Sequence, residues 1–105
     1  MTAKKENIDL PSFTEADKFI HEPARLMIMS ILYLVKSVDY MFLKNQLNMT
    51  FGNLSSHISK LEAKGYITVE KKFIGKKPYT IPILSEKGKS AYEDYRNKIK
   101  VITSI

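Results

Sequence analysis

The chain has 105 residues, which is enough for one folded domain with a single hydrophobic core. Hydrophobic residues make up 44% of it and charged residues 27%, a composition typical of a folded soluble domain and not of a disordered chain. Lysine and arginine number 17 against 11 aspartate and glutamate residues, so the formal net charge is +6. This excess favours a polyanionic partner, either nucleic acid or an anionic membrane surface.

Several classes of site are excluded by residues that the sequence lacks. It has no cysteine, which excludes disulfides, thiolate metal sites and cysteine nucleophiles, and His21 and His57 are too far apart for a metal-ligand motif. The polar stretch 1–10 lacks a signal-peptide core, and the apolar run 26–35 is about half of the roughly 20 residues needed to cross a bilayer. No helix pattern joins a lysine-rich face to a broad apolar one. We therefore expect a cytoplasmic protein with no metal, no cofactor, no catalytic residue and no membrane contact.

The chain is predicted to begin with an arm and a short helix. Residues 1–12 carry charge without periodicity and are expected to form a flexible N-terminal arm, ahead of a single domain at 13–105. Thr14 starts a capping-box pattern in which Asp17 takes the usual place of glutamate, and this pattern predicts a short helix.

A long apolar helix is predicted next. Pro23 suits the first position of a helix that runs to about residue 36, because its fixed φ and missing N–H cost nothing there. Nine of the ten residues from Leu26 to Val35 are apolar. Such a helix needs cover on all sides, and a partner subunit is the simplest cover for a domain this small.

Two further helices form a predicted helix-turn-helix. Asp39 is a suitable N-cap for a helix that continues through Leu47. Residues 47–50 favour a tight turn, since asparagine tolerates unusual backbone angles and the threonine at its end can cap the next helix. That helix is predicted over 51–64, with Gly65 ending it. In a helix-turn-helix the second helix lies in the major groove of DNA.

A hairpin and a last helix complete the predicted fold. Strands are predicted at 66–74 and 79–84, joined by the glycine- and proline-containing connection 75–78. Pro82 cannot donate a ladder hydrogen bond, so the second strand should be an edge strand or irregular. Ser85 then caps a helix from Glu86 to about Thr103. The fold class is α+β and mostly α: a winged helix-turn-helix with a three-helix core, a two-stranded β-hairpin and a long C-terminal helix.

The third helix of this core has a face suited to nucleic acid. On a helical wheel the residues assigned to the core are Leu54, His57, Ile58 and Leu61. The opposite face holds small, hydrogen-bonding or cationic side chains that can approach DNA closely. Taken alone, this pattern fits the solvent-exposed face of an ordinary amphipathic helix equally well.

Charge in the neighbouring segment favours the DNA interpretation. From Thr50 to Leu84 there are six lysines and two glutamates, a local net charge of +4. Solubility and edge protection would explain each hairpin lysine separately, but they explain the clustering less well. The residues predicted to contact DNA are Thr50, Gly52, Asn53, Ser55, Ser56, Ser59, Lys60, Lys71, Lys72, Lys76 and Lys77.

The stretch from Phe42 to Tyr92 resembles the winged-helix regulators of the MarR and ArsR type, especially their single-domain prokaryotic relatives. The resemblance rests on the runs 47–67, 75–80 and 84–88. It implies a sequence-specific transcriptional regulator that binds double-stranded DNA as a homodimer on a roughly palindromic operator, with helix 51–64 in the major groove and hairpin 66–84 as the wing. Two departures stand out: the cysteine and histidine clusters of the ArsR metal sensors are absent, and the wing carries lysine where many relatives carry arginine.

The last helix carries an apolar stripe that predicts a two-fold interface. Its first half should pack on its own domain, while its second half projects beyond the core. Segment 86–105 is therefore predicted to dimerise, together with part of the first apolar helix. The predicted interface residues are Leu26, Ile28, Tyr92, Tyr95, Ile99 and Ile102.

Two other interpretations remain open. A pocket for a small apolar effector would need residues that are more often plain core, namely Phe13, Phe19, Met27, Met29 and Met41. A winged helix can also serve as a protein–protein interaction module, which would predict an apolar reading face where this one carries serine and lysine. An enzyme would need a nucleophile–base pair or a phosphate-binding glycine loop, and the sequence offers neither.

Overall fold

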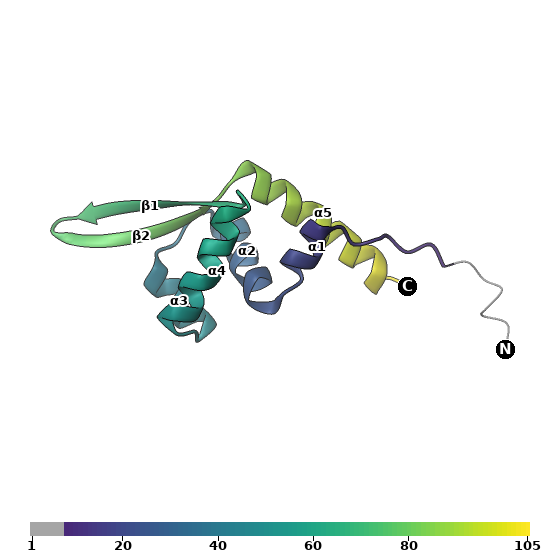
Figure 1. Ribbon diagram of the computed structural model, residues 1–105, viewed down its shortest axis with the longest axis horizontal. Coiled ribbons are helices and arrows are strands. Elements are labelled where there is room, and N and C mark those ends of the chain that lie inside the picture. The colour runs from purple at the N-terminus through teal and green to yellow at the C-terminus, as the bar shows by residue number, and fades with distance from the viewer. Residues whose placement is uncertain (1–7) are drawn as a thin grey trace.

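The structure of the protein is a computed structural model that describes residues 8–105. Most of the predicted flexible arm, residues 1–7, lies outside the described residues, and residues 8–12 have no regular secondary structure. The elements are α1 (Glu15–Ile20), α2 (Pro23–Val35), α3 (Tyr40–Leu47), α4 (Phe51–Ala63), β1 (Ile67–Ile74), β2 (Lys77–Leu84) and α5 (Glu86–Thr103). This order confirms the predicted winged helix-turn-helix (Figure 1). Within the described residues, each helix is too short or too polar to span a lipid bilayer.

The predicted helix starts are confirmed by their caps. Each of Thr14, Asp39, Thr50 and Ser85 has an extended backbone, and its side chain accepts a hydrogen bond from the N–H three residues later. Asp17 completes the capping box at α1 by accepting from the backbone N–H of Thr14. The turn between α3 and α4 depends on the asparagine at its start, Asn48, which adopts a left-handed φ of 53°.

The hairpin differs from the prediction at its connection. β2 begins at Lys77 rather than at residue 79, so the turn contains only Gly75 and Lys76, and Ile74 pairs with Lys77. The predicted four-residue connection was wrong because Pro78 is tolerated inside the strand. In an antiparallel ladder, hydrogen-bonded and non-hydrogen-bonded pairs alternate, and a two-residue turn is flanked by a hydrogen-bonded pair. Pro78 and Pro82 therefore both fall at non-hydrogen-bonded pairs, where a missing N–H costs nothing. Gly75, with φ of 66°, supplies the left-handed residue that starts such a turn.

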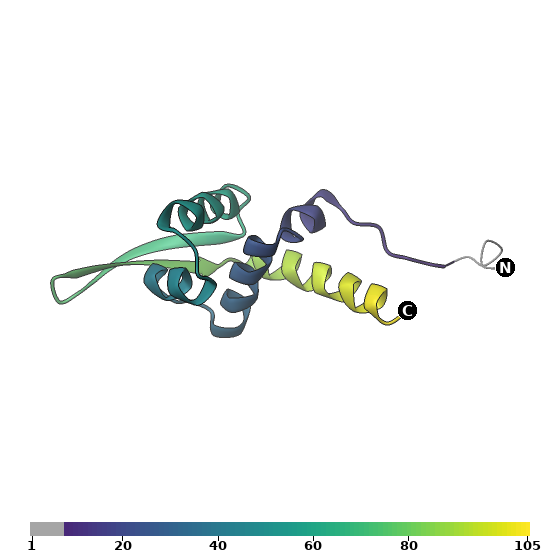
Figure 2. The same cartoon turned by 90° about the horizontal axis from the view of Figure 1, so that it is seen from below.

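The hydrophobic core lies between α2, α4, α5 and the base of the hairpin. Its fully buried side chains include Ile28, Leu32, Leu54, Leu61 and Ile67. The far half of the hairpin extends away from this core at one end of the molecule, while α5 and the N-terminal segment extend at the other (Figures 1 and 2). Both views therefore show the tip of the hairpin separated from the helical body.

Helix α2 is not covered on all sides within the one chain. Ile28, Met29 and Leu32 are buried in the core, but Leu34 keeps 80% of its surface exposed and Val35 about half. The sequence predicts that α2 is covered on all sides. Within a single chain only one of its faces is covered. The expectation that a partner subunit supplies the rest stays a prediction.

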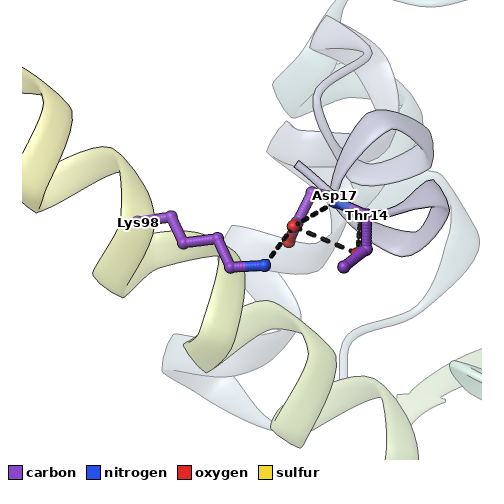
Figure 3. A network of polar contacts seen from close by, with 3 residues as sticks. All are labelled: Thr14, Asp17 and Lys98. Carbon is purple, nitrogen blue, oxygen red and sulfur yellow. Dashed lines mark hydrogen bonds and ion pairs between the residues drawn. The ribbon is translucent and has the colours of Figure 1, made fainter. Parts of the chain in front are cut away.

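A buried ion pair joins α1 to α5. The Asp17 carboxylate is 1% exposed, and it accepts hydrogen bonds from Lys98 Nζ and from the backbone N–H and hydroxyl of Thr14 (Figure 3). Burial by itself would raise the pKa of Asp17, but the hydrogen bonds from Lys98 and Thr14 outweigh it, so the pKa lies below the ordinary value of 3.8. The charge on this carboxylate is therefore held in place, and α1 is tied to α5 by it.

Aromatic side chains extend this contact. Tyr95 Oη lies 2.7 Å from His21 Nδ1, and the Tyr95 ring packs against Phe13 with a centroid distance of 5.8 Å. Burial raises the pKa of the Tyr95 hydroxyl, and the negative charge of Asp17 raises it further. This contact makes Tyr95 a member of the chain's own core.

The placement of the last helix corrects part of the predicted dimer interface. Ile28 is 0%, Tyr95 4% and Tyr92 9% exposed within the single chain. Tyr92 also makes a hydrogen bond of 2.9 Å with Ser30 of α2. Tyr92 and Tyr95 have almost no surface left for a second subunit, because α2 and the α1 region already cover them, and Ile28 is fully buried in the core. Among the predicted interface residues, only the half-buried Leu26, Ile99 and Ile102 keep accessible surface.

Candidate nucleic-acid interface

Helix α4 presents the face that the sequence predicts. Leu54, Ile58 and Leu61 are buried against the core. The opposite face is open to solvent, and it carries every predicted contact residue of this segment: Thr50, Gly52, Asn53, Ser55, Ser56, Ser59 and Lys60. From Thr50 to Lys60 no acidic residue occurs, and the first carboxylate is Glu62 in the last turn of the helix. An anion can therefore approach most of this helix without meeting a like charge.

The half-buried His57 belongs to the inner side of α4. Its Nδ1 atom lies 3.5 Å from Arg25 Nη1 and 3.9 Å from Glu22 Oε1, both at the start of α2. Arg25 also donates from Nε to the carbonyl of Phe19 at 2.8 Å and lies over the Phe19 ring. These contacts hold α1, α2 and α4 together and set the position of α4. They give His57 a structural role rather than a place on the outer face.

Three residues that meet at the N-terminal end of α4, two of them from α3, were not predicted from the sequence. The Tyr40 and Phe51 rings stack with centroids 6.3 Å apart, and Lys44 Nζ lies 5.5 Å from the centroid of Phe51. The Tyr40 hydroxyl donates to Ser55 Oγ at 3.2 Å, so one predicted DNA contact already has a partner within the chain. Phe51 is about half exposed. The sequence signal that could have indicated this cluster is Phe51, an aromatic residue directly after the N-cap Thr50, at a position that need not be buried.

The four lysines predicted on the hairpin are all exposed. Lys71 and Lys72 are successive residues of β1, so their side chains leave opposite faces of the ribbon. Lys72 lies 3.8 Å from Glu70, the only acidic residue in the hairpin, and Lys77 lies 5.6 Å from the centroid of the Tyr79 ring. Lys76 stands in the turn itself. The ribbon therefore carries positive charge on both faces and at its tip.

A groove connects the hairpin to the helix-turn-helix. It has a volume of about 400 Å³ and is lined by the start of α3, by the first residue of α4 and by the outer half of β2. The lining residues are Asp39, Tyr40, Met41, Phe51, Lys77, Pro78, Tyr79 and Thr80. The second strand of the hairpin thus lies beside the N-terminal end of α4. One extended polyanion can contact both.

The residues considered for an effector pocket do not come together. Met29 is buried in the core, while Met27 lines a shallow groove between α2 and α3, and Met41 lines the groove beside the hairpin. Phe13 packs on Tyr95, and Phe19 packs under Arg25. Within residues 8–105 these five side chains therefore do not line one cavity, and the effector interpretation gains no support.

The sequence and the fold together define the class of protein. A family model described as a winged helix DNA-binding domain matches residues 24–103, and the chain belongs to this family. The predicted resemblance to winged-helix regulators is thereby confirmed.

Particular relatives narrow this further. An uncharacterized protein of Methanocaldococcus jannaschii is 33% identical over 78 residues, which cover 74% of this chain and 85% of that protein. The structure of a transcriptional regulator homologue from Pyrococcus horikoshii OT3 is similar to this one with a TM-score of 0.78 and 26% identity, over 83% of this chain and 86% of that chain. Reduced AbfR bound to DNA has a TM-score of 0.67 at 16% identity, over 81% of this chain and 62% of that one, a likeness of fold alone.

Proposed function

We propose that the protein is a prokaryotic, cytoplasmic transcriptional regulator that binds double-stranded DNA as a homodimer. Helix α4 enters the major groove, and the β1–β2 hairpin lies along the phosphate backbone as the wing. The observation that carries this proposal is the exposed outer face of α4, free of acidic residues as far as Lys60, beside a ribbon with four exposed lysines. The protein acts by binding and not by catalysis.

The side chains on α4 divide into reading and positioning residues. Asn53 can pair with adenine through two hydrogen bonds, and Ser56 and Ser59 can reach base edges or phosphate oxygens. Lys60, one turn nearer the hairpin base, is suited to phosphate. Gly52 has no atom within 4 Å of where a Cβ would lie, so it leaves open space at the surface rather than fitting a contact within the chain. Small side chains here let the helix axis approach the groove floor.

The same face argues against a protein–protein module. A protein partner of stable affinity is held mainly by a buried apolar or aromatic centre. The one large apolar side chain exposed on α4 is Phe51, which lies at the edge of this face. The centre of the face is made of serines and Lys60. A surface of this kind gains little from a protein partner but can accept the hydrogen bonds and charges of a duplex.

The dimer forms through the C-terminal half of α5. Val101 is about half exposed and Ile105 71% exposed, and the half-buried Ile99 and Ile102 lie on the same half of the helix. Leu10, in the segment before α1, is also about half exposed. Burying this surface against a second copy would relate two α4 helices by a two-fold axis, as a palindromic site requires.

Selection of bound fragments from a random DNA pool by the full chain tests this function. Enriched sequences should be roughly palindromic, and neutralising about 6 to 10 phosphates predicts that affinity falls roughly 10³- to 10⁵-fold between about 50 and 200 mM salt. Ser56→Glu should abolish binding by repulsion from phosphate without changing the fold. Ser90→Glu, an exposed serine on α5, is the matched control and should bind like the wild type.

Two results would contradict the proposal. A flat salt response, or equal binding by wild type and Ser56→Glu, would remove the duplex from the outer face of α4. A monomer at tens of micromolar in sedimentation equilibrium would remove the homodimer but leave the DNA-binding face in place.

A further inference from the structure

The tip of the hairpin exposes two large apolar side chains. Phe73 is 73% and Ile74 64% exposed, which makes them among the most exposed large apolar side chains in the described chain. On β1, Ile74 is five residues beyond Val69, the last half-buried residue of that strand, a length of about 17 Å at roughly 3.4 Å per residue. On β2 the half-buried residues reach Tyr79, which pairs with Lys72. Figure 1 shows the end of the ribbon clear of all the helices.

Neither Phe73 nor Ile74 is needed to form or stabilise the hairpin. The turn is formed by Gly75 and Lys76, and an exposed position in a two-stranded ribbon can be filled by a polar β-branched residue at no loss of packing. Phe73 pairs with Pro78 and Ile74 pairs with Lys77, and successive residues point to opposite faces. Each face of the tip therefore presents one large apolar side chain to solvent, where it contributes almost nothing to folding.

The charge around the tip selects its partner. Lys71, Lys72, Lys76 and Lys77 surround the two apolar residues, and Glu70 is the only acidic residue of the hairpin. Two such tips would repel each other, which disfavours a contact between copies of the chain. A polyanion with an apolar interior fits both features, and the groove beside Phe51 links the ribbon to the face of α4 where the proposed duplex lies.

We infer that the hairpin tip enters the minor groove and inserts Phe73 or Ile74 between stacked base pairs, so that the protein bends its operator. This inference rests on the proposed function and adds deformation of the DNA to it. Two strands about 4.8 Å apart, with their side chains, are too wide for a minor groove of about 6 Å, so the groove must open. An apolar wedge opens it by unstacking one step, which costs least at TA and CA steps.

The test measures unstacking and bending on one probe. The probe is a duplex recovered by the full chain from the random pool, with 2-aminopurine replacing adenine at a TA or CA step and a dye pair on its ends. Wild-type protein should raise the 2-aminopurine fluorescence and bend the duplex within the range of about 20–90° that apolar wedges produce. The double variant F73S/I74S should lose most of both changes. It should keep the salt dependence of binding, because all four lysines remain.

A second variant separates insertion from damage to the ribbon. F73L/I74M keeps the tip apolar and should still unstack and bend the duplex, while both variants should melt at the wild-type temperature. If wild type binds the probe without unstacking or bending it, or if F73S/I74S bends it equally, the inference is wrong and the proposed function stands. If wild type binds no duplex at all, the proposed function fails as well.

A lipid surface is the other polyanion with an apolar interior. Co-sedimentation of wild type with phosphatidylserine–phosphatidylcholine vesicles, lost in F73S/I74S, would assign the tip to membranes and overturn the inference.

Discussion

The α1–α5 contact and the β1–β2 hairpin differ in whether their charged and polar side chains are paired within the chain. Where α1 packs on α5, Asp17 and Lys98 form a buried ion pair, and Tyr95 is hydrogen-bonded to His21. No buried side-chain nitrogen or oxygen among residues 8–105 lacks a hydrogen-bond partner. On the hairpin, by contrast, three of four lysines have no carboxylate within 4 Å, and the apolar side chains at the tip face water.

This difference shows which charged side chains are available to a binding partner. A cation whose charge is already paired within a buried site stabilises the fold, whereas an exposed cation without a carboxylate neighbour adds little to stability and can release counterions when it meets phosphate. The same residue type therefore has different roles at the two ends. Matched substitutions at buried and at exposed positions test the comparison.

Two glycines give the largest predicted contrast. A Cβ on Gly88 would lie 2.0 Å from the carbonyl oxygen of Tyr66, so α5 would have to move away from the start of the hairpin. Gly88→Ala should cost more than about 3 kcal/mol, the upper end of the usual range for overpacking. A Cβ on Gly52 would meet nothing within 4 Å, and Gly52→Ala should be neutral or slightly stabilising.

Chemical denaturation of both glycine variants measures this contrast. Equal stability of Gly88→Ala and Gly52→Ala would mean that α5 does not approach β1 as closely as described.

Two lysines give the next contrast. Lys98→Met leaves the Asp17 carboxylate buried without its cation and should cost about 2–3 kcal/mol, somewhat less than a fully buried pair because Lys98 is 25% exposed. Lys76→Met on the hairpin turn should leave stability within about 0.5 kcal/mol of wild type, but lower the salt dependence of DNA binding.

The pH dependence of the Lys98 variant follows from the pKa of Asp17. Because this pKa is lowered on folding, the stabilisation is fully present above the ordinary value of 3.8 and is lost as pH falls through the lower, folded value. The stability gap between wild type and Lys98→Met should therefore narrow as pH falls below about 4, since a neutral carboxyl needs no cation. Thermal melts from pH 3 to pH 7 measure it, and a gap that is constant over this range would contradict the ion pair as its cause.

The sequence was sufficient for most of the fold because its information is local. Caps at Thr14, Asp39, Thr50 and Ser85, and the left-handed Asn48, each act within four residues, and all five were predicted correctly. The exposed face of α4 follows from helical periodicity in the same way. The start of the second strand was misplaced because strand register depends on pairing across the turn, where Pro78 looks like a strand breaker but lies at a position that needs no N–H.

Contacts between distant parts of the chain could not be predicted. The sequence shows an apolar stripe on α5 but does not say whether α1 or a second subunit covers it, so Tyr92 and Tyr95 were assigned to the wrong partner. Asp17 and Lys98 are 81 residues apart, and as isolated charges on amphipathic helices they resemble ordinary solvent-facing residues. For the same reason the stacking of Tyr40 on Phe51 needed the packing of α3 on α4 to become visible.

Two tyrosines give the smallest predicted contrast and the finest test of the comparison. Tyr95→Phe removes a buried hydroxyl that lies 2.7 Å from His21 Nδ1 and should cost about 1 kcal/mol, the usual net contribution of one hydrogen bond. Tyr79→Phe on the hairpin keeps the ring beside Lys77 and should change stability by less than about 0.5 kcal/mol. For a domain of this size a loss of 1 kcal/mol lowers the melting temperature by roughly 4–8 °C, so calorimetry distinguishes the two. A loss at Tyr79 as large as that at Tyr95 would show that the hairpin is stabilised by contacts of its own. It would then no longer follow that its lysines and apolar tip are available for DNA because they do not stabilise the fold.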